Sequence, residues 1–216
     1  MMKKTRKYSA FDKFITHADR ALRTLLAAPE VTERPYPAER IEEAELTEKE
    51  REHHGRLMRI NHTGEICAQA LYQGQGLTAK LPEVREQMKR AADEENDHLD
   101  WCKHRINELD GRTSFLNPFW FVASYGMGSL AGFIGDKWSL GFVAETERQV
   151  GRHLKSHLNQ IPIYDQRTRV IIEQMALDEA RHEDTAIKGG AAKLPFPIKM
   201  AMKVNAKIMT KTVYYF

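Results

Sequence analysis

Apolar residues recur every three or four positions along most of the chain, a pattern that predicts amphipathic helices. No segment of useful length alternates apolar and polar residues as a half-buried strand would. The expected helices cover residues 11–28, 47–81, 82–109, 117–135, 138–158, 167–187 and 198–215. We therefore expect an all-α protein.

Capping and breaking signals set the ends of these helices. Thr47 and Glu50 stand three apart in the order of a capping box, which predicts a helix start. Pro29 ends the first helix, and Gly189 with Gly190 ends the sixth. We expect one domain over residues 1–216, with an N-terminal extension at 1–45, a helical bundle at 46–190 and a basic tail at 191–216.

The segment 117–135 contains no charged residue, and its nineteen positions approach the length of a membrane span. Its four glycines and the adjacent Asp136 and Lys137 argue against a complete span. We expect a helix that is half buried in the bundle and half in contact with lipid. A simple core helix is the alternative.

The last predicted helix carries lysines at every fourth position, which places them in one stripe with apolar residues to one side. The lysines are Lys199, Lys203, Lys207 and Lys211, and the apolar residues are Ile198, Met202, Met209 and Val213. This basic amphipathic pattern favours a helix that lies on an anionic membrane surface. A solvated lysine face on a helix docked to the core is the alternative.

The charge distribution and the cysteine content predict where in the cell the protein lies. The formal net charge is only +3, but no Asp or Glu follows Asp184, so the C-terminal end is basic and predicts an anionic neighbour, either phospholipid or nucleic acid. Two cysteines without Cys-x-x-Cys spacing favour a reducing compartment, and the N-terminus lacks the apolar run of a secretory signal. We expect the protein at the cytoplasmic face of the cell membrane, bound peripherally.

The candidate chemistry begins with Glu95 and His98, which stand three apart on a predicted helix and so share one face. A single Glu-x-x-His pair is weak evidence, because exposed helices are rich in glutamate. The pair recurs, however, as Glu179 and His182 on the sixth predicted helix. Two such pairs on separate helices make a shared metal site worth testing.

Each Glu-x-x-His helix is preceded by a helix with a further glutamate. Glu65 lies 30 residues before Glu95, and Glu147 lies 32 residues before Glu179, so one helical unit occurs twice. Folded together, the two units would present four carboxylates and two imidazoles, the ligand set of di-iron or di-manganese bundles. Without cations, so many buried carboxylates would cost more free energy than a domain has to spare. A purely structural bundle is the alternative.

Roles follow from this geometry. Two carboxylates would bridge the metals, and each metal would keep one histidine, one terminal glutamate and open positions for dioxygen. We expect Asp178 and Glu94 to accept the outer N–H of the imidazole on the opposite helix, with a solvated charge as the alternative for Glu94. Glu145 competes with Glu147, but the repeat favours Glu147. We expect surface or capping roles for the remaining candidates, His53, His54, His62, His153 and His157.

With these residues in place, the chain resembles the demethoxyubiquinol hydroxylase family of ubiquinone biosynthesis. The resemblance covers about residues 52–188, and its Asn-His-Thr-Gly-Glu stretch is more specific than the Glu-x-x-His pairs. Its motifs are Arg59–Glu65, Tyr72–Gln75, Glu94–His98, Ala144–Glu147 and Asp178–His182. At Gly151–His153 the chain departs from the His and Tyr arrangement of many members, so a redox or substrate role there stays open.

The resemblance implies a ferritin-like, membrane-associated di-iron monooxygenase. Two iron ions would be held by Glu65, Glu95, His98, Glu147, Glu179 and His182. The enzyme would use O2 to hydroxylate the ring of 2-polyprenyl-3-methyl-6-methoxy-1,4-benzoquinol, a substrate whose tail partitions into lipid. The external reductant and contacts with other ubiquinone-biosynthesis proteins stay open.

Two other functions fit the same bundle. A di-iron hydroxylase of a modified tRNA base would need a basic surface around the metal site, whereas the basic residues here fall at the chain ends, so we expect no nucleic-acid partner. A ferritin-like protein that stores iron or removes peroxide has no need of a lipid-facing segment. No Gly-rich phosphate loop follows a strand, so we expect no built-in nucleotide domain.

Overall fold

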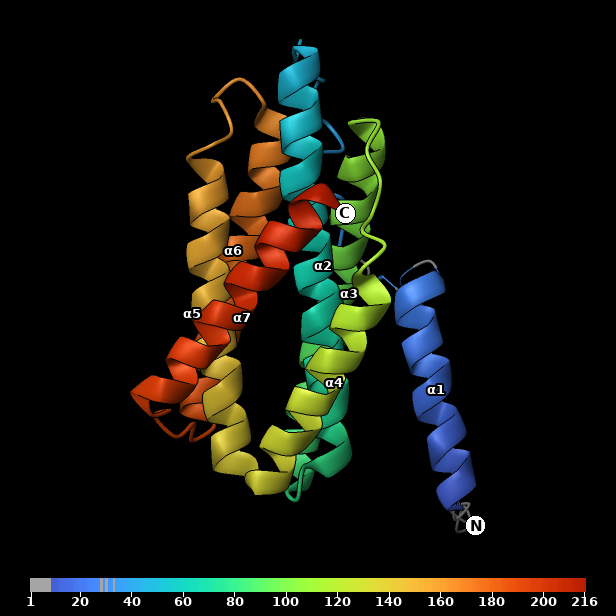
Figure 1. Ribbon diagram of the computed structural model, residues 1–216, viewed down its shortest axis with the longest axis vertical. Coiled ribbons are helices and arrows are strands. Elements are labelled where there is room, and N and C mark those ends of the chain that lie inside the picture. Colours follow the sequence, from blue (N-terminus) through green and yellow to red (C-terminus); the bar gives the residue numbers. More distant parts are fainter. Residues whose placement is uncertain (1–8, 28, 30, 33) are drawn as a thin grey trace.

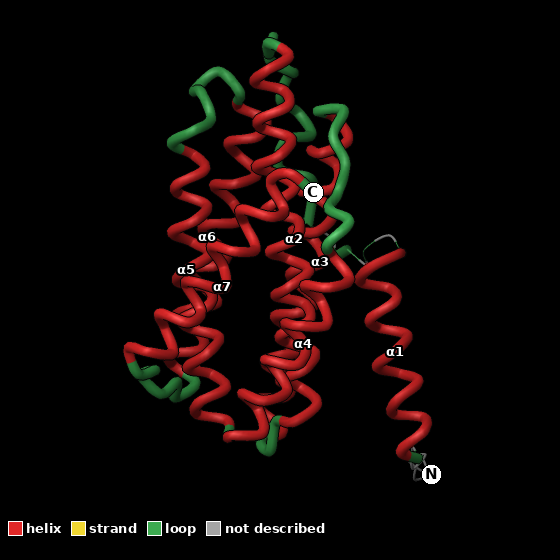
Figure 2. Tube along the Cα trace, viewed as in Figure 1, coloured by secondary structure: helices red, strands yellow, loops and turns green. Residues whose placement is uncertain are grey.

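The computed structural model describes residues 9–27, 29, 31–32 and 34–216, and Figures 1 and 2 show that helices make up most of them. These are α1 (Ala10–Leu26), α2 (Glu48–Thr78), α3 (Pro82–Glu108), α4 (Asn117–Ile134), α5 (Asp136–Leu158), α6 (Gln166–Lys188) and α7 (Phe196–Tyr215). No strand occurs among the described residues. The prediction of an all-α protein is confirmed.

The helix ends lie within three residues of their predicted positions wherever they can be compared. Thr47 caps α2 in a capping box with Glu50, as predicted. The predicted end of the first helix, residue 28, lies outside the described residues. The fifth helix starts at Asp136, earlier than expected, because Gly135 has a φ of 146° and lets the chain turn directly from α4 into α5.

Helices α2, α3, α5 and α6 form the predicted four-helix bundle. Helix α2 packs against α3, α5 packs against α6, and contacts of α3 with α6 and of α2 with α5 join the two pairs. Two hydrophobic clusters fill the bundle, one around Met58, Trp101 and Ile171 and the other around Met88 and Leu140. The Glu-x-x-His residues occupy the layer between these two clusters.

Helix α4 lies along α2 at very short range. A Cβ added to Gly128 of α4 would stand 2.3 Å from the carbonyl oxygen of Leu71, and one added to Gly74 of α2 would stand 2.4 Å from that of Tyr125. Only glycine allows this backbone approach. The expectation that this segment is half buried holds, because Trp120 and Phe121 are buried whereas Phe119, Val122, Leu130, Phe133 and Ile134 are exposed.

Lipid contact of α4 stays a prediction. Among the described residues, we find no helix whose length and hydropathy would suit a membrane span.

Helix α7 crosses the bundle diagonally in Figure 1 and contacts α2 and α5. Its buried side is the one that carries Met209 and Val213, which pack with Ile60 and Trp120. Both residues belong to the apolar side that the pattern placed beside the lysine stripe, so α7 is docked to the core as the alternative expected. Contact of this helix with a membrane stays a prediction. A second apolar stripe is exposed on α7 next to Lys203, Lys207 and Lys211, and it consists of Phe196, Met200, Val204 and Ile208.

A buried ionic network joins the connection before α2 to the bundle. The guanidinium of Arg105 on α3 is fully buried and donates to Glu43 at 2.5 Å, to Glu108 at 2.9 Å and to Asp165 at 3.1 Å. Asp165, also buried, caps α6 by accepting the backbone N–H of Thr168 at 3.1 Å. Arg105 therefore holds three separate segments of the chain together.

We predict that Arg105→Met destabilises the protein by about 3–5 kcal/mol, because it leaves the buried carboxylate of Asp165 without its cation. Urea unfolding followed by circular dichroism measures this change. The matched control is Arg90→Met on the same helix, where an exposed pair with Glu86 should contribute less than about 1 kcal/mol. Equal destabilisation by both variants would contradict the prediction.

Candidate metal centre

The six predicted ligand residues meet in the middle of the bundle. Glu65 comes from α2, Glu95 and His98 from α3, Glu147 from α5, and Glu179 and His182 from α6. None is more than 8% exposed. Each lies on the inward stripe of its helix, as the helical period requires.

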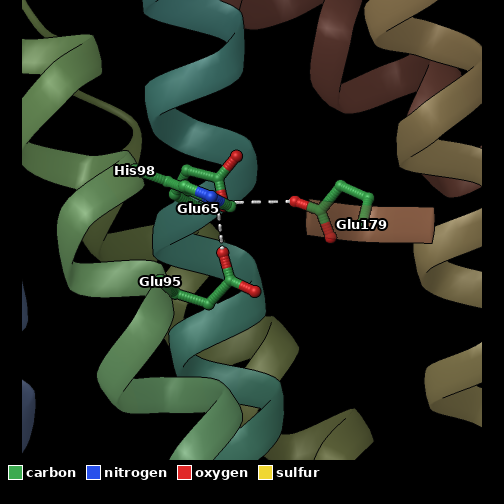
Figure 3. A group of neighbouring side chains, drawn as sticks. All are labelled: Glu65, Glu95, His98 and Glu179. Atoms are coloured by element: carbon green, nitrogen blue, oxygen red, sulfur yellow. Dashed lines mark hydrogen bonds and ion pairs between the residues drawn. The ribbon is translucent and has the colours of Figure 1, made fainter. Parts of the chain in front are cut away.

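Four of these residues form the tightest group. One ligand atom from each of Glu65, Glu95, His98 and Glu179 lies within 4.8 Å of the others. Figure 3 shows these four side chains pointing toward one another. The Nδ1 atom of His98 is 2.8 Å from Glu95 Oε2, 3.6 Å from Glu179 Oε1 and 3.8 Å from Glu65 Oε2. The imidazole thus faces three carboxylates from three helices.

The other two residues adjoin this group. His182 Nδ1 is 3.1 Å from Glu95 Oε1 and 3.6 Å from Glu179 Oε2, so these two glutamates lie between the imidazoles of His98 and His182. Glu147 is buried next to Glu179. The structure therefore brings all six predicted residues together, and their role as metal ligands stays a prediction.

Both imidazoles are oriented by carboxylates outside the cluster. His98 Nε2 is 3.0 Å from Asp178 Oδ2, and His182 Nε2 is 2.8 Å from Glu94 Oε2. In each case the acid and the imidazole belong to opposite Glu-x-x-His helices, so the predicted hydrogen bonds are confirmed. An Nε2–H that donates outward leaves Nδ1 free to bind a metal.

Burial decides the direction of the pKa shift for two of the glutamates, Glu65 and Glu147. It raises the pKa of Glu65 well above its ordinary value, and the negative charge of Glu95 adds to the effect. Burial likewise raises the pKa of Glu147, with a further contribution from Glu179. Burial thus favours the protonated form of both side chains.

For His98, His182 and Glu95, the neighbouring charges outweigh burial in setting the direction of the pKa shift. Burial would lower the pKa of His98 and of His182, but the surrounding carboxylates outweigh it and hold both pKa values well above the ordinary range. Burial would raise the pKa of Glu95, but the two imidazoles outweigh it and the pKa is lowered. Metal ions bound at this cluster would compete with protons, because carboxylates and imidazoles bind a metal in their deprotonated forms.

The donor set fits divalent metal ions. Glu95 Oε1, Glu179 Oε2 and His182 Nδ1 are buried close together, but among the described residues none of them makes a hydrogen bond of acceptable geometry. Four carboxylates and two imidazoles, with no thiolate, suit iron or manganese. The four negative charges match two divalent cations, which is how such a set is used in carboxylate-bridged bundles.

Two residues that the sequence analysis did not propose as part of the metal site reach it. The hydroxyl of Tyr72 donates to Glu147 Oε1, and burial together with that carboxylate raises the pKa of Tyr72 well above its ordinary value. Because Tyr72 follows Glu65 by seven residues, helical spacing could have placed it on the same face. Arg34 donates to Asp178 from the segment before α2, where no periodicity points to it.

The choice between the two glutamates of α5 is decided by their contacts. Glu145 faces Arg148 and Gln149 on its own helix and lies 3.7 Å from Lys199 Nζ. It takes no part in the cluster. Glu147 occupies the third-helix position, as the repeat predicts.

The five isolated histidines lie outside the cluster, but the surface roles expected for them were wrong in part. His54, His62 and His157 are buried, and burial lowers the pKa of His62 to about 4. His54 Nδ1 is 2.7 Å from Asp165 Oδ2, and His53 Nδ1 is 2.9 Å from the hydroxyl of Tyr214. The remaining ring, His153, is in edge contact with His157. These rings sit on inward faces of α2 and α5, which a single histidine in a sequence does not reveal.

Comparison with known proteins agrees with this geometry. The family model described as ubiquinone biosynthesis protein COQ7 matches residues 52–213, which is most of the chain. The chain belongs to this family. The resemblance inferred from the sequence motifs is thereby confirmed, and the matched region includes all six residues of the cluster.

Relatives match over almost their whole length. A protein from Acinetobacter baumannii named 3-demethoxyubiquinol 3-hydroxylase is 54% identical over 97% of this chain and 99% of its own. Proteins with the same name from Chromohalobacter salexigens, at 53% over the same shares, and from Dechloromonas aromatica, at 55% over 95% and 99%, are similarly close. Membership of the COQ7 family therefore concerns the whole chain.

We predict that Glu95→Ala lowers the metal content from about two ions per chain to one or fewer, because Glu95 faces both imidazoles. Elemental analysis after anaerobic loading with ferrous iron measures the ratio. Glu86→Ala, an exposed substitution on the same helix, is the control and should leave the ratio unchanged. Two ions retained in the Glu95 variant would contradict the ligand assignment.

Proposed function

We propose that this protein is a di-iron monooxygenase that hydroxylates the ring of demethoxyubiquinol in ubiquinone biosynthesis. The observation that carries the proposal is the buried cluster of four carboxylates and two imidazoles in a chain of the COQ7 family. The name shared by its relatives, 3-demethoxyubiquinol 3-hydroxylase, supplies the substrate and the reaction. The residues of the buried cluster and the name of the relatives both support an oxidative reaction.

Two irons held by the cluster would supply the reduction of dioxygen, so that one oxygen atom enters the ring C–H bond and the other leaves as water. This balance needs two electrons and two protons besides the substrate, and the source of the electrons stays open.

The side chains of the protein do the remaining work. Asp178 and Glu94 hold the two imidazoles with Nδ1 towards the cluster. The neutral phenol of Tyr72 donates to Glu147 and fixes that carboxylate at the edge of the site. The hydrophobic clusters above and below exclude water, which strengthens each electrostatic interaction between them.

We further propose that the protein binds the cytoplasmic face of the cell membrane, where a polyprenyl substrate would lie. Exposed apolar side chains support this, because α4 presents Phe119, Val122 and Phe133, and α7 presents a stripe that includes Met200 and Val204. Apolar residues flanked by lysines suit the headgroup region of an anionic leaflet. A nucleic-acid surface would have little use for these apolar side chains.

We expect cells that lack this protein to accumulate a quinone lighter than ubiquinone by one methoxy group. Mass spectrometry of lipid extracts tests this expectation, and the wild-type chain should restore ubiquinone whereas Glu179→Ala should not. Glu173→Ala, an exposed substitution on the same helix, is the control and should restore it. A normal quinone profile in the deficient cells would overturn the proposed function.

The membrane proposal is tested with vesicles. Exchanging Lys203, Lys207 and Lys211 for alanine should weaken binding to vesicles containing anionic phospholipid by roughly 100-fold, at about 1 kcal/mol for each lysine. The control exchanges three other exposed lysines, Lys49, Lys89 and Lys155, and keeps the same net charge. Equal loss in both variants would show that net charge alone, and no specific face, drives the binding.

A further inference from the structure

The segment before α2 reaches the metal centre from outside the region that the family model matches. We call residues 31–32 and 34–38 the N-terminal strap. Thr32 attaches it to α3, because its backbone N–H donates to Asp97 Oδ1 at 2.7 Å and its hydroxyl donates to Asp97 Oδ2 at 2.7 Å. Thr32 is exposed but Asp97 is fully buried, so the strap is attached to a buried carboxylate.

Arg34 extends this anchor to α6. Its Nη2 donates to Asp178 Oδ2, its Nη1 lies 3.7 Å from Asp97 Oδ2, and its guanidinium lies 4.7 Å from the ring centroid of Trp101. The side chain is 29% exposed. One guanidinium therefore bridges carboxylates of two Glu-x-x-His helices while stacked on an aromatic ring, a use that suits arginine better than lysine.

The oxygen of Asp178 that receives Arg34 is the one that faces His98 Nε2 at 3.0 Å. The other oxygen accepts from Gln174 at 3.2 Å and lies 3.1 Å from Arg181. Arg34 thus fixes which way the carboxylate turns and keeps its charge on the imidazole side. We propose that Arg34 is a positioning residue, which acts through Asp178 to hold His98 in place for one of the two metal ions.

The inference rests on the proposed metal site. It implies that His98 and His182, the histidines of the two halves of this site, are supported to different degrees. Glu94, which orients His182, is also paired with an arginine, Arg181, at 2.7 Å. That arginine is 56% exposed, and exposed ion pairs contribute little. The His98 half is held by a partly buried guanidinium from a separate segment, so its geometry depends on Arg34 far more than the His182 half depends on Arg181.

The test uses the full chain loaded anaerobically with ferrous iron, and it follows iron release to a colorimetric chelator. In Arg34→Gln one of the two irons should leave about 10–100-fold faster, the usual cost of losing support behind a ligand, while the other leaves at the wild-type rate. Arg34→Lys, which keeps the charge without the planar fork, should fall between. Arg40→Gln, an exposed arginine before α2, is the control.

Two further variants, Asp178→Asn and Thr32→Val, distinguish an effect of Arg34 through Asp178 from a general loosening of the strap. In Asp178→Asn, the further change Arg34→Gln should have no additional effect, because the intermediary is already altered. Thr32→Val removes the hydroxyl that bonds Asp97 and the backbone N–H of Arg34, but it keeps the side-chain contacts of Arg34, so this variant should release iron at wild-type rates. An additive effect of Arg34→Gln on the Asp178 variant, or a Thr32 variant as fast as Arg34→Gln, would overturn the inference.

The outcomes also separate this inference from the proposed function. A wild-type chain that binds no iron contradicts the di-iron assignment itself. A wild-type chain that binds two irons, together with an Arg34→Gln variant that releases both at wild-type rates, contradicts only the role of Arg34. Should Arg34→Gln fail to fold by circular dichroism, the Arg34→Lys variant provides the same comparison.

Discussion

The structure depends on the cost of burying negative charge. Four carboxylates lie in one layer of a helical bundle, and each would be unstable there without a compensating positive group. In the metal-free chain, the raised pKa values of Glu65, Glu147 and His98 favour the protonated forms, which reduces the negative charge of this layer. The two hydrophobic clusters on either side of the layer supply the apolar burial that stabilises the fold. The residues of the polar layer between them can therefore serve the chemistry of the site.

The two helical units depend on each other at this layer. Asp178 of one unit orients His98 of the other, and Glu94 orients His182 in return. Each imidazole thus has its outer nitrogen held by an acid of the other unit. This reciprocity explains why a sequence repeat with an offset of 82 to 84 residues is a stronger sign of function than either Glu-x-x-His pair.

Much of the fold and six residues of the site could be predicted because both are encoded by local spacing. Helical periodicity sets the inward faces, and three-residue steps place Glu95 with His98 on one of them. Arg34 escaped prediction because its partner, Asp178, is 144 residues away and its own segment is irregular. The docked face of α7 escaped because that helix has apolar residues on two sides, and local spacing does not say which side meets the bundle.

The glycine contact between α2 and α4 has a geometric consequence. With Gly74 and Gly128 against opposing backbone, α4 cannot roll or slide on α2 without steric overlap. The exposed apolar face of α4 and the carboxylate of Glu65 on α2 therefore belong to one rigid body. The fold itself therefore fixes how far the carboxylate cluster lies from that apolar face.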